Sequence, residues 1–246
     1  VPQLASCVLH YNNADSRDGL LGTMRDISTF SSDAAGIGLA MSNIRSKESR
    51  ISTSGGYAGG LLKYLKIVNE SLRFFNQQGR RPGSAAIYLE PWHKDIFDLL
   101  DIKKNTGAEE LRARDLFTAL WLPDNFMKAV ETNGDWYLFC PNDINKAGIK
   151  PLQECYGQEY ENNYNRAVQL GLGKKTKAQE IWNKIIESQV ETGVPYLLAK
   201  DSVNSKSNHQ NIGVVKQSNL CAEIVQYTDE ETTAICTLSS MVLKNF

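Results

Sequence analysis

Hydrophobic and polar residues follow two different spacings along this chain of 246 residues. In several stretches the apolar residues recur every three or four positions, which is typical of a helix with one buried face. Shorter apolar stretches lie between them and are typical of buried strands. The predicted helices are residues 16–32, 61–75, 94–100, 123–131, 159–170 and 177–191, and the predicted strands are 1–9, 85–89, 116–122, 196–198 and 233–238, with a strand or turn at 34–41. Because strands and helices alternate, we expect an α/β protein built on a mainly parallel sheet.

The polar stretches between these elements are predicted to be loops, and two of them carry arginine residues. The 43–60 stretch is rich in serine and glycine and is expected to be a flexible surface loop. The 76–83 stretch joins amide side chains to the pair Arg80 and Arg81, which could read the edge of a nucleobase or hold a phosphate. Arginine pairs beside glycine are also common on ordinary surfaces, so this stretch alone does not identify a ligand site. The other predicted loops are 142–157 and 202–211.

The stretch Ser218–Val225 alternates polar and aliphatic residues. In extended backbone every second side chain points to the same face, so Asn219, Cys221 and Glu223 would lie side by side. A carboxylate can take up a proton, an amide can hold a substrate hydroxyl, and a thiol can take part in radical, nucleophilic or redox chemistry. The alternative is an ordinary half-buried strand with a structural cysteine. The octet alone leaves both interpretations open.

The charged residues are nearly balanced, with 27 basic and 28 acidic residues and a net charge of -1. This balance argues against broad binding to nucleic acid or to an anionic membrane, although a local basic loop is compatible with it. No apolar run approaches the roughly 20 residues that a helix needs to span a bilayer. With 41% hydrophobic residues, the chain can bury a sizeable core, as one large domain or as two.

The cysteines do not form a pattern that indicates structural disulfides or a metal site. They are Cys7, Cys140, Cys155, Cys221 and Cys236. An odd number at wide spacing is a poor disulfide framework, and no Cys-x-x-Cys or Cys/His cluster suggests zinc. A reducing cytoplasm therefore fits, in which a disulfide would be catalytic rather than structural. Because the chain begins with Val1 rather than Met, and its last residues are apolar-rich without a stop signal, we expect a fragment of a longer protein.

Five longer motifs occur in the order that they have in one enzyme family. They are Tyr-Leu-Glu-Pro-Trp-His at 88–93, Arg-Ala-Arg-Asp-Leu-Phe at 112–117, Ala-Leu-Trp-Leu-Pro-Asp at 119–124, Glu-Ser-Gln-Val-Glu-Thr-Gly at 187–193 and Ser-Asn-Leu-Cys-Ala-Glu at 218–223. With these motifs the chain resembles the catalytic (large) subunit of class I ribonucleotide reductase. The resemblance extends from Gln3 to Ser239 and implies the middle part of that subunit, without either flank. His93, at the end of the first motif, has no neighbouring histidine and is predicted to be a structural residue rather than a ligand or base.

The resemblance implies a fold and a catalytic group. The family's fold is a ten-stranded α/β barrel with the catalytic cysteine at the tip of an inner finger loop, and residues 1–246 would form part of that barrel domain. By motif match the cysteine is Cys221, which in the family becomes a transient thiyl radical and abstracts the 3′ hydrogen of a ribonucleotide. Glu223 matches the general base for the 3′ hydroxyl, and Asn219 matches the amide that orients the ribose hydroxyls.

Two further cysteines match the redox pair of the family. Cys7 and Cys236 match the thiols that supply reducing equivalents, so that the 2′ hydroxyl is lost as water and a disulfide is left. On this interpretation they must approach to about 5.5–6 Å between Cα atoms when oxidised. Ser6 and Gly36 match positions that line the substrate site and help hold its diphosphate. The two remaining cysteines match no active-site residue.

The resemblance also implies an allosteric specificity site within this chain. Asp15, Arg45 and Ile51 match positions that bind an effector nucleoside triphosphate across a dimer contact. The second arginine-containing loop matches the segment that passes the identity of the effector to the substrate base. Within that loop, Gln77 and Arg81 are the candidates for contacts to the base.

Partners and cofactors also follow from the resemblance. The radical would come from a metal-containing small subunit, and no cofactor or metal ion would be bound by this chain itself. The large subunit would form a homodimer, take ribonucleoside diphosphates as substrates and be reduced again by thioredoxin or glutaredoxin. Its products, deoxyribonucleotides, would serve DNA synthesis in the cytoplasm. Without its flanks, the chain alone is expected to be inactive.

Two alternatives remain at this point. One is the adenosylcobalamin-dependent class of the same enzymes, which shares the barrel and the cysteine triad. The other is a non-catalytic nucleotide-binding paralogue that keeps only the fold. The presence of all five matched residues argues against this second alternative: Cys7, Asn219, Cys221, Glu223 and Cys236.

Overall fold

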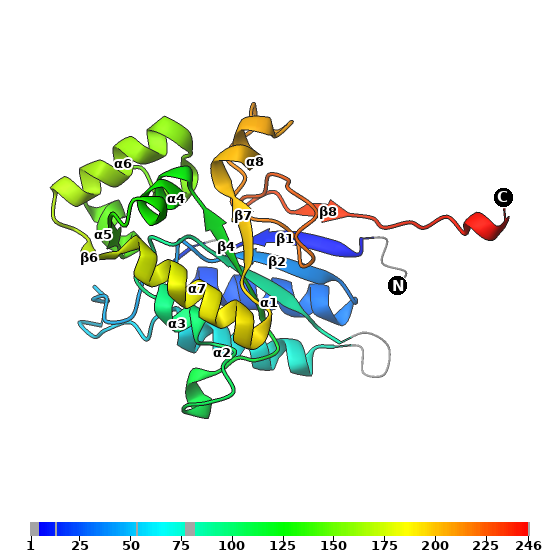
Figure 1. The fold of residues 1–246 in the computed structure, drawn as a ribbon. Helices are drawn as coiled ribbons and strands as arrows, with labels where there is room; N and C mark the ends of the chain where they lie inside the picture. Colours follow the sequence, from blue (N-terminus) through cyan, green and yellow to red (C-terminus); the bar gives the residue numbers. More distant parts are fainter. Residues whose placement is uncertain (1–4, 13, 53, 77–81, 246) are drawn as a thin grey trace.

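The computed structural model describes residues 5–12, 14–52, 54–76 and 82–245, and its largest element is a six-stranded sheet (Figure 1). The strands are β1 (Cys7–Tyr11), β2 (Gly36–Ala40), β3 (Ala85–Leu89), β4 (Phe117–Leu122), β7 (Tyr196–Ala199) and β8 (Ala234–Cys236). Their order in the sheet is β7-β4-β3-β2-β1-β8. All neighbours from β7 to β1 are parallel, whereas β8 is antiparallel to β1.

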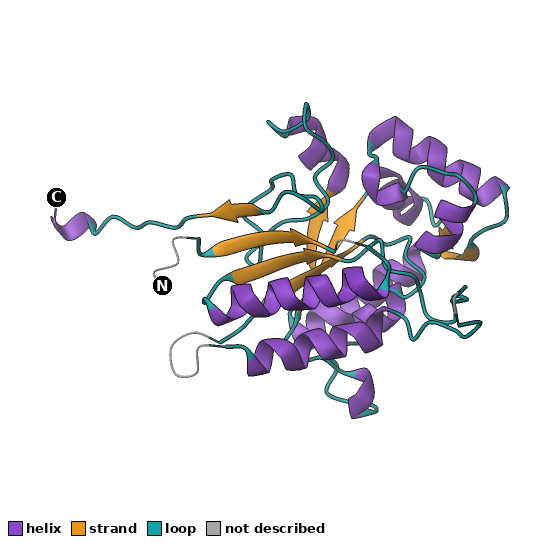
Figure 2. Ribbon diagram, turned by 180° about the vertical axis from the view of Figure 1, so that it is seen from behind, coloured by secondary structure: helices purple, strands orange, loops and turns teal. Residues whose placement is uncertain are grey.

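Helices connect the parallel strands and cover one face of the sheet (Figure 2). They are α1 (Arg17–Ser32), α2 (Leu61–Phe74), α3 (Ile96–Leu100) and α7 (Ala178–Thr192). Parallel neighbours need such crossovers because each strand starts at the same edge of the sheet. The helices α1 and α2 lie side by side, and the Tyr64 hydroxyl of α2 donates to the Leu20 carbonyl of α1 at 2.9 Å.

A smaller layer is inserted between β4 and α7. It consists of α4 (Asp124–Glu131), β5 (Asp135–Leu138), α5 (Pro141–Lys146), the 3-10 helix η2 (Leu152–Glu154), α6 (Gly157–Gln169) and β6 (Lys174–Lys177). The strands β5 and β6 pair antiparallel. Trp136 of β5 stacks on Tyr164 of α6, with ring centroids 4.6 Å apart, and its indole N–H donates to the Pro91 carbonyl at 3.1 Å. This contact attaches the layer to the segment that follows β3.

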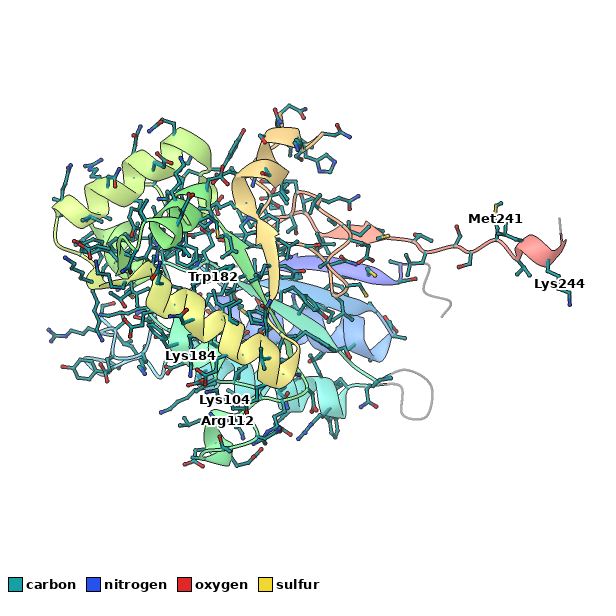
Figure 3. All side chains as sticks on the ribbon, in the orientation of Figure 1. Lys104, Arg112, Trp182, Lys184, Met241 and Lys244 are labelled. Carbon is teal, nitrogen blue, oxygen red and sulfur yellow. The ribbon has the colours of Figure 1, made fainter. Side chains whose placement is uncertain are left out.

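Three elements lie outside these layers. They are η1 (Glu109–Leu111), α8 (Lys200–Lys206) directly after β7, and η3 (Leu243–Asn245). After β8 the chain leaves the sheet, and Figure 3 shows Met241 and Lys244 on this last segment, away from the rest of the molecule. Among the helices that the structure describes, none has the length and apolar character needed to cross a membrane.

The two faces of the sheet carry side chains of different size. On the helix side, the strands contribute large aliphatic residues to the main core: Ile37, Leu39, Ile87 and Leu89. On the opposite face, Gly36, Gly38, Ala86 and Ala119 are small, whereas Tyr88 and Trp121, further along β3 and β4, are large. Successive residues of a strand point to opposite faces, which explains this separation. The small residues leave room for another segment of the chain on that face.

Most of the predicted elements are present, and the fold class is confirmed as α/β with a mainly parallel sheet. The predicted loops 142–157 and 202–211 are wrong in part, because α5 and α8 extend into them. The β5–β6 pair was not predicted, because β6 is a Lys-Lys-Thr-Lys sequence without apolar residues. Instead, Lys175 and Lys177 form ion pairs with Asp135 of β5, at 2.6 and 2.8 Å. Part of the predicted strand 1–9 lies outside the described residues.

Candidate active site

The 213–228 loop lies against the small-residue face of the sheet. A side chain at Gly38 would overlap the backbone of this loop and would approach the Cα atom of Asn219 to 2.8 Å. A side chain at Gly36 would approach Leu220 to 2.7 Å. Glycine at both positions therefore lets the loop lie directly on β2.

Buried side chains fix this loop to three strands. The Gln217 amide donates to the carbonyls of His10 in β1 and Gly38 in β2, at 2.8 and 3.0 Å. The Tyr88 hydroxyl of β3 donates to the Asn219 carbonyl at 2.6 Å. Buried polar groups are costly unless they are hydrogen-bonded, so these contacts favour one position of the loop.

The two ends of the loop are held as well. Asn204 of α8 donates to the Val215 carbonyl at 3.0 Å and accepts from the Val215 N–H at 2.7 Å. At the other end, the Thr228 hydroxyl donates to the Leu9 carbonyl of β1 at 3.1 Å. The segment between these anchors is therefore held in one position over the face of the sheet.

The tip of the loop is a turn built around the side chain of Asn219. Its amide oxygen accepts from the N–H groups of Glu223 and Ile224, at 3.0 and 3.1 Å, and its amide nitrogen donates to the Glu223 carboxylate at 2.7 Å. Ala222 has a φ of 65°, in the left-handed region that tight turns use. The extended backbone expected for Ser218–Val225 is therefore wrong. Asparagine satisfies nearby backbone N–H groups with its own side chain, which favours a turn.

The turn places the three predicted reactive groups in different surroundings. The Asn219 side chain is buried, whereas Cys221 and Glu223 are exposed. Because the amide and the carboxylate are in contact, one can hold a hydroxyl while the other takes up its proton. The thiol belongs to the same turn as the buried amide and the exposed carboxylate.

Cys7 and Cys236 are direct neighbours across the antiparallel pair β1–β8. Both are free thiols, with Cys7 buried and Cys236 half-buried. Opposed residues in antiparallel strands have Cα atoms about 4.5–5.5 Å apart, which is within the range that a disulfide can span. The pair is therefore placed so that it could be oxidised without rearrangement of the sheet.

Ser6 and Gly36 adjoin this thiol pair. The Ser6 N–H donates to the Cys236 carbonyl and the Gly36 N–H donates to the Ser6 carbonyl, each at 2.9 Å. Gly36 is the register partner of Cys7, and Leu220 lies against it. Since Leu220 directly precedes Cys221, the tip of the loop and the thiol pair occupy the same region of the sheet.

A cavity of about 740 Å³ opens beside the first turns of α1 and α2 and the 43–60 loop; we call it the second cavity, because the site on the sheet is described first. Asp15, Arg45 and Ile51 all line it. The Arg45 guanidinium donates to the Asp15 carboxylate at 2.6 Å and to the Asp15 backbone carbonyl at 3.1 Å. Burial raises the pKa of Asp15, and the bonds from Arg45 oppose that shift.

This second cavity has features that favour an anion. Two helices begin at it, since Ser16 caps α1 and Gly60 precedes α2. A helix N-terminus carries a partial positive charge, although here the Gly19 N–H donates to the Ser16 hydroxyl and the Leu61 N–H to the Asp95 carboxylate. Arg17 and Lys63 also line the cavity, as does Asp18, which pairs with Arg17 at 3.0 Å. A phosphate group would therefore find suitable donors there.

Comparison with known proteins assigns the chain to a family. The model of the family described as ribonucleotide reductase, barrel domain, matches residues 5–246. The chain belongs to the ribonucleotide reductase family. It is 51% identical to the ribonucleoside-diphosphate reductase large subunit of Danio rerio, 46% identical to that of Arabidopsis thaliana and 44% identical to the large chain 2 of Saccharomyces cerevisiae. Each match covers 100% of this chain but only 30%, 30% and 28% of the relative, respectively.

The match to the ribonucleotide reductase barrel domain confirms the resemblance and the fold class inferred from the motifs. The structure gathers most of the predicted reductase residues at two places. At the sheet lie Ser6, Cys7, Gly36, Asn219, Cys221, Glu223 and Cys236, and at the second cavity lie Asp15, Arg45 and Ile51. Gln77 and Arg81 lie outside the described residues. The roles of all these residues stay predictions.

Several residues that shape the site on the sheet were not predicted from the sequence. Tyr88 lies in the first motif and Gln217 directly precedes the last one, so motif membership was the available signal. Asn204 gave no signal, because it lies in a stretch that was predicted to be a loop. His93 is confirmed as a structural residue, since its ring is buried and Nε2 lies 2.7 Å from the Ile44 carbonyl.

Proposed function

We propose that this chain is part of the catalytic subunit of a ribonucleoside-diphosphate reductase, which reduces ribonucleotides to deoxyribonucleotides by thiyl-radical chemistry. The observation that carries the proposal is the turn around Asn219, which joins the amide, the Glu223 carboxylate and Cys221 next to the Cys7–Cys236 pair. The Asn219 side chain also closes the turn, but the proposed reaction uses the amide, the carboxylate and the three thiols together.

In this proposal each side chain has one task. The Cys221 thiyl radical takes the 3′ hydrogen of the ribose, and its S–H bond is formed and oxidised again in each cycle. Glu223 takes the proton of the 3′ hydroxyl, and Asn219 orients the ribose hydroxyls. The thiols of Cys7 and Cys236 supply two electrons, so that the 2′ hydroxyl leaves as water and the two sulfurs form a disulfide.

The substrate would be a ribonucleoside diphosphate. Ser6 and Gly36 adjoin the redox pair, which supports a role for them near the ribose and its diphosphate. The absence of a side chain at Gly36 lets Leu220 pack against β2, which keeps the tip of the loop in this region. Gln77 and Arg81 would contact the base.

The second cavity would take an effector nucleoside triphosphate, held by Asp15, Arg45 and Ile51. Its size, its two helix N-termini and its basic residues support a ligand with phosphate groups. In the proposed enzyme this effector would be shared across the contact of a homodimer. It would select which base is accepted at the active site.

The remaining partners are proposed from the family. A small subunit that contains a metal would supply the radical, and thioredoxin or glutaredoxin would reduce the disulfide again. The enzyme would act in the cytoplasm, without nucleic acid or a membrane as a partner. The relatives named above are all ribonucleoside-diphosphate reductases, which favours this enzyme over the adenosylcobalamin-dependent class and over a non-catalytic paralogue.

The decisive experiment is Cys221→Ala in the complete large subunit, assayed for reduction of a ribonucleoside diphosphate with the small subunit and a reductant. We expect no detectable deoxyribonucleotide, because alanine cannot carry the radical. We also expect unchanged thermal unfolding, because Cys221 is exposed. Cys140→Ala is the matched control and should remain active. Turnover by Cys221→Ala would disprove the proposed function.

A further inference from the structure

The segment that follows β3 holds both ends of the loop that lines the second cavity. The Asp95 carboxylate accepts from the N–H of Lys47 at 3.1 and 3.2 Å and from the N–H of Leu61 at 2.9 Å. Two residues earlier, Nε2 of His93 lies 2.7 Å from the Ile44 carbonyl. One carboxylate and one imidazole therefore connect the start of the loop with its end.

The hydrogen bonds define the tautomer of His93. Its Nδ1 accepts from the Asp95 N–H at 3.1 Å, so Nε2 carries the proton and donates to Ile44. Burial lowers the pKa of His93, which favours this neutral ring, while Asp95 opposes the shift. Both side chains are buried, with 0% of His93 and 2% of Asp95 exposed. Water would therefore not replace these bonds if one partner were removed.

The end of the loop fits closely around this carboxylate. Gly60 has a φ of 81°, in the left-handed region that favours glycine. A Cβ atom at this position would lie 2.8 Å from the Lys47 nitrogen and 2.9 Å from an Asp95 oxygen. The junction has no space for a side chain, so its geometry is narrowly defined.

The anchored residues are sequence neighbours of residues that line the cavity. Arg45 lies between the two anchors Ile44 and Lys47, and Gly59 and Gly60 directly precede the third. A shift of either end of the loop would therefore move the Arg45 guanidinium or the N-terminus of α2. We call residues 44–60 the effector loop.

We propose that Asp95 and His93 are positioning residues, which hold the two ends of the effector loop together and thereby keep the second cavity in the form that binds a nucleoside triphosphate. The inference rests on the effector function proposed for that cavity. Neither residue lines the cavity. Both would act on the ligand indirectly, by holding the backbone of the loop.

The test measures nucleotide binding by the complete protein. Calorimetric titration with dTTP is performed on the wild type and on Arg45→Ala, and the binding that Arg45→Ala removes is assigned to the cavity. In Asp95→Ala we expect this binding to weaken by about tenfold or more, because two buried N–H groups lose a charged acceptor. Asp95→Asn keeps one acceptor oxygen and should weaken binding less. His93→Phe, which removes the bond to Ile44, should also weaken it.

The matched control is Asp98→Asn. Asp98 lies three residues further along and pairs with the exposed ammonium of Lys47 at 2.8 Å, a surface contact whose loss should leave dTTP binding unchanged. Limited trypsin digestion provides a second measurement that a general loss of stability would not reproduce. In Asp95→Ala, cleavage within the effector loop should become faster, while cleavage after Lys128 in α4 stays at the wild-type rate.

The outcomes separate the two proposals. If the wild type shows no dTTP binding that Arg45→Ala removes, the effector function of the cavity is wrong and the inference is lost with it. If the wild type binds but folded Asp95→Ala binds equally well, the positioning role is wrong and the effector site stands. Should Asp95→Ala not fold, Asp95→Asn and His93→Phe decide in the same way, since wild-type affinity in both would overturn the inference.

Discussion

Glycine at position 38 is required by the loop rather than by the strand. Gly38 is not among the described residues with positive φ, so its backbone would accept other amino acids. The space beside it is instead filled by the backbone at Ser218 and Asn219. A residue of β2 therefore determines how closely the turn with Cys221 approaches the sheet.

Gly38→Ala should consequently displace the loop. Overpacking of this kind costs about 1–3 kcal/mol, so we expect a lower unfolding temperature together with a strong loss of reductase activity. Gly56→Ala is the control, because a Cβ atom there would only meet the Ser54 hydroxyl at 3.5 Å. Thermal unfolding and turnover of the complete subunit are compared for both variants. Equal behaviour of the two would contradict the proposed fit of the loop on β2.

The thiol pair leads to a second prediction at this scale. When substrate and the small subunit are added without a reductant, one cycle should leave Cys7 and Cys236 joined as a disulfide, since they are already opposite each other. Peptide mapping after alkylation measures the bond. Cys140 and Cys155, which are free and buried, should remain thiols and serve as internal controls. Free Cys7 and Cys236 after turnover would contradict their role as reductant.

At the scale of residues, the sequence predicted which side chains meet but not how. Asn219 and Glu223 were expected together because of the spacing of an extended strand. They are in contact because the asparagine side chain closes a turn. Periodicity describes regular backbone only, and it contains no information on a loop that is stabilised by its own side chains.

Among the elements, α8 has a polar sequence, but its first residue is buried. Lys200 is fully buried, and its ammonium pairs with the Glu90 carboxylate at 2.7 Å and with the Leu152 carbonyl at 2.8 Å. It also lies 4.5 Å from the centre of the Tyr160 ring. These contacts connect the start of α8 to the end of β3 and to the inserted layer. They also help to place Asn204, which holds the 213–228 loop.

Lys200→Met should therefore destabilise the protein much more than loss of a surface ion pair. Removing one partner of a buried pair typically costs about 3–5 kcal/mol, because the other charge stays buried. Lys128→Met is the control; its side chain is 71% exposed and its pair with Glu161 should contribute at most about 1 kcal/mol. Thermal unfolding at neutral pH compares the two. A similar loss in both variants would show that the buried pair is unimportant.

The same variant has a predictable pH dependence. Burial raises the pKa of Glu90, and Lys200 opposes this shift, so removal of the lysine should raise the pKa further. A carboxyl group with a raised pKa in the folded state stabilises the fold below its unfolded pKa and loses that contribution as the pH rises. The stability deficit of Lys200→Met should accordingly be smaller at about pH 5 than at about pH 7.5. A deficit independent of pH would argue against an ionised Glu90.

The elements that were not predicted share a physical cause. The long helices α1, α2 and α7 have clear apolar spacing, and all three were predicted to within two residues. By contrast, α8 and β6 are short and polar, and their stability depends on partners that are distant in sequence. Glu90, for example, lies 110 residues before Lys200. The sequence of α8 itself contains no pattern that indicates such a partner.

For the molecule as a whole, the outer surface of α1 and α2 is the main candidate for contact with a second subunit. Leu21 of α1 and Ile67 of α2 are 62% and 58% exposed. Ile67 also lines the second cavity, so this apolar surface adjoins the proposed effector site. The arrangement supports the proposed homodimer, in which one effector would contact both subunits.

Leu21→Glu should weaken that dimer. A charge buried in an apolar contact is unfavourable, so sedimentation velocity should show monomer at concentrations where the wild type is dimeric. Binding of dTTP should weaken with it, since dimerisation and effector binding would be linked. Leu170→Glu is the control, because Leu170 is 54% exposed at the end of α6, away from α1 and α2. An unchanged dimer in Leu21→Glu would exclude this surface as the contact.

The alternation of strands and helices was sufficient to predict the fold class. It did not provide the strand order or the antiparallel direction of β8, because a three-residue strand carries little information. Only the resemblance indicated that Cys7 and Cys236 must meet. The register of β1 and β8 depends on contacts between residues that are far apart in the sequence, and local patterns contain no information on such contacts.

The two glycines of β2 under the loop, Gly36 and Gly38, have a consequence for the order of unfolding. Residues 215–219 are buried although they belong to no helix or strand, because they fill the space that side chains of β2 and β3 leave open. This backbone therefore substitutes for aliphatic packing. On heating, an ordinary loop frays first, but this one should stay protected from hydrogen exchange until the strands beneath it separate.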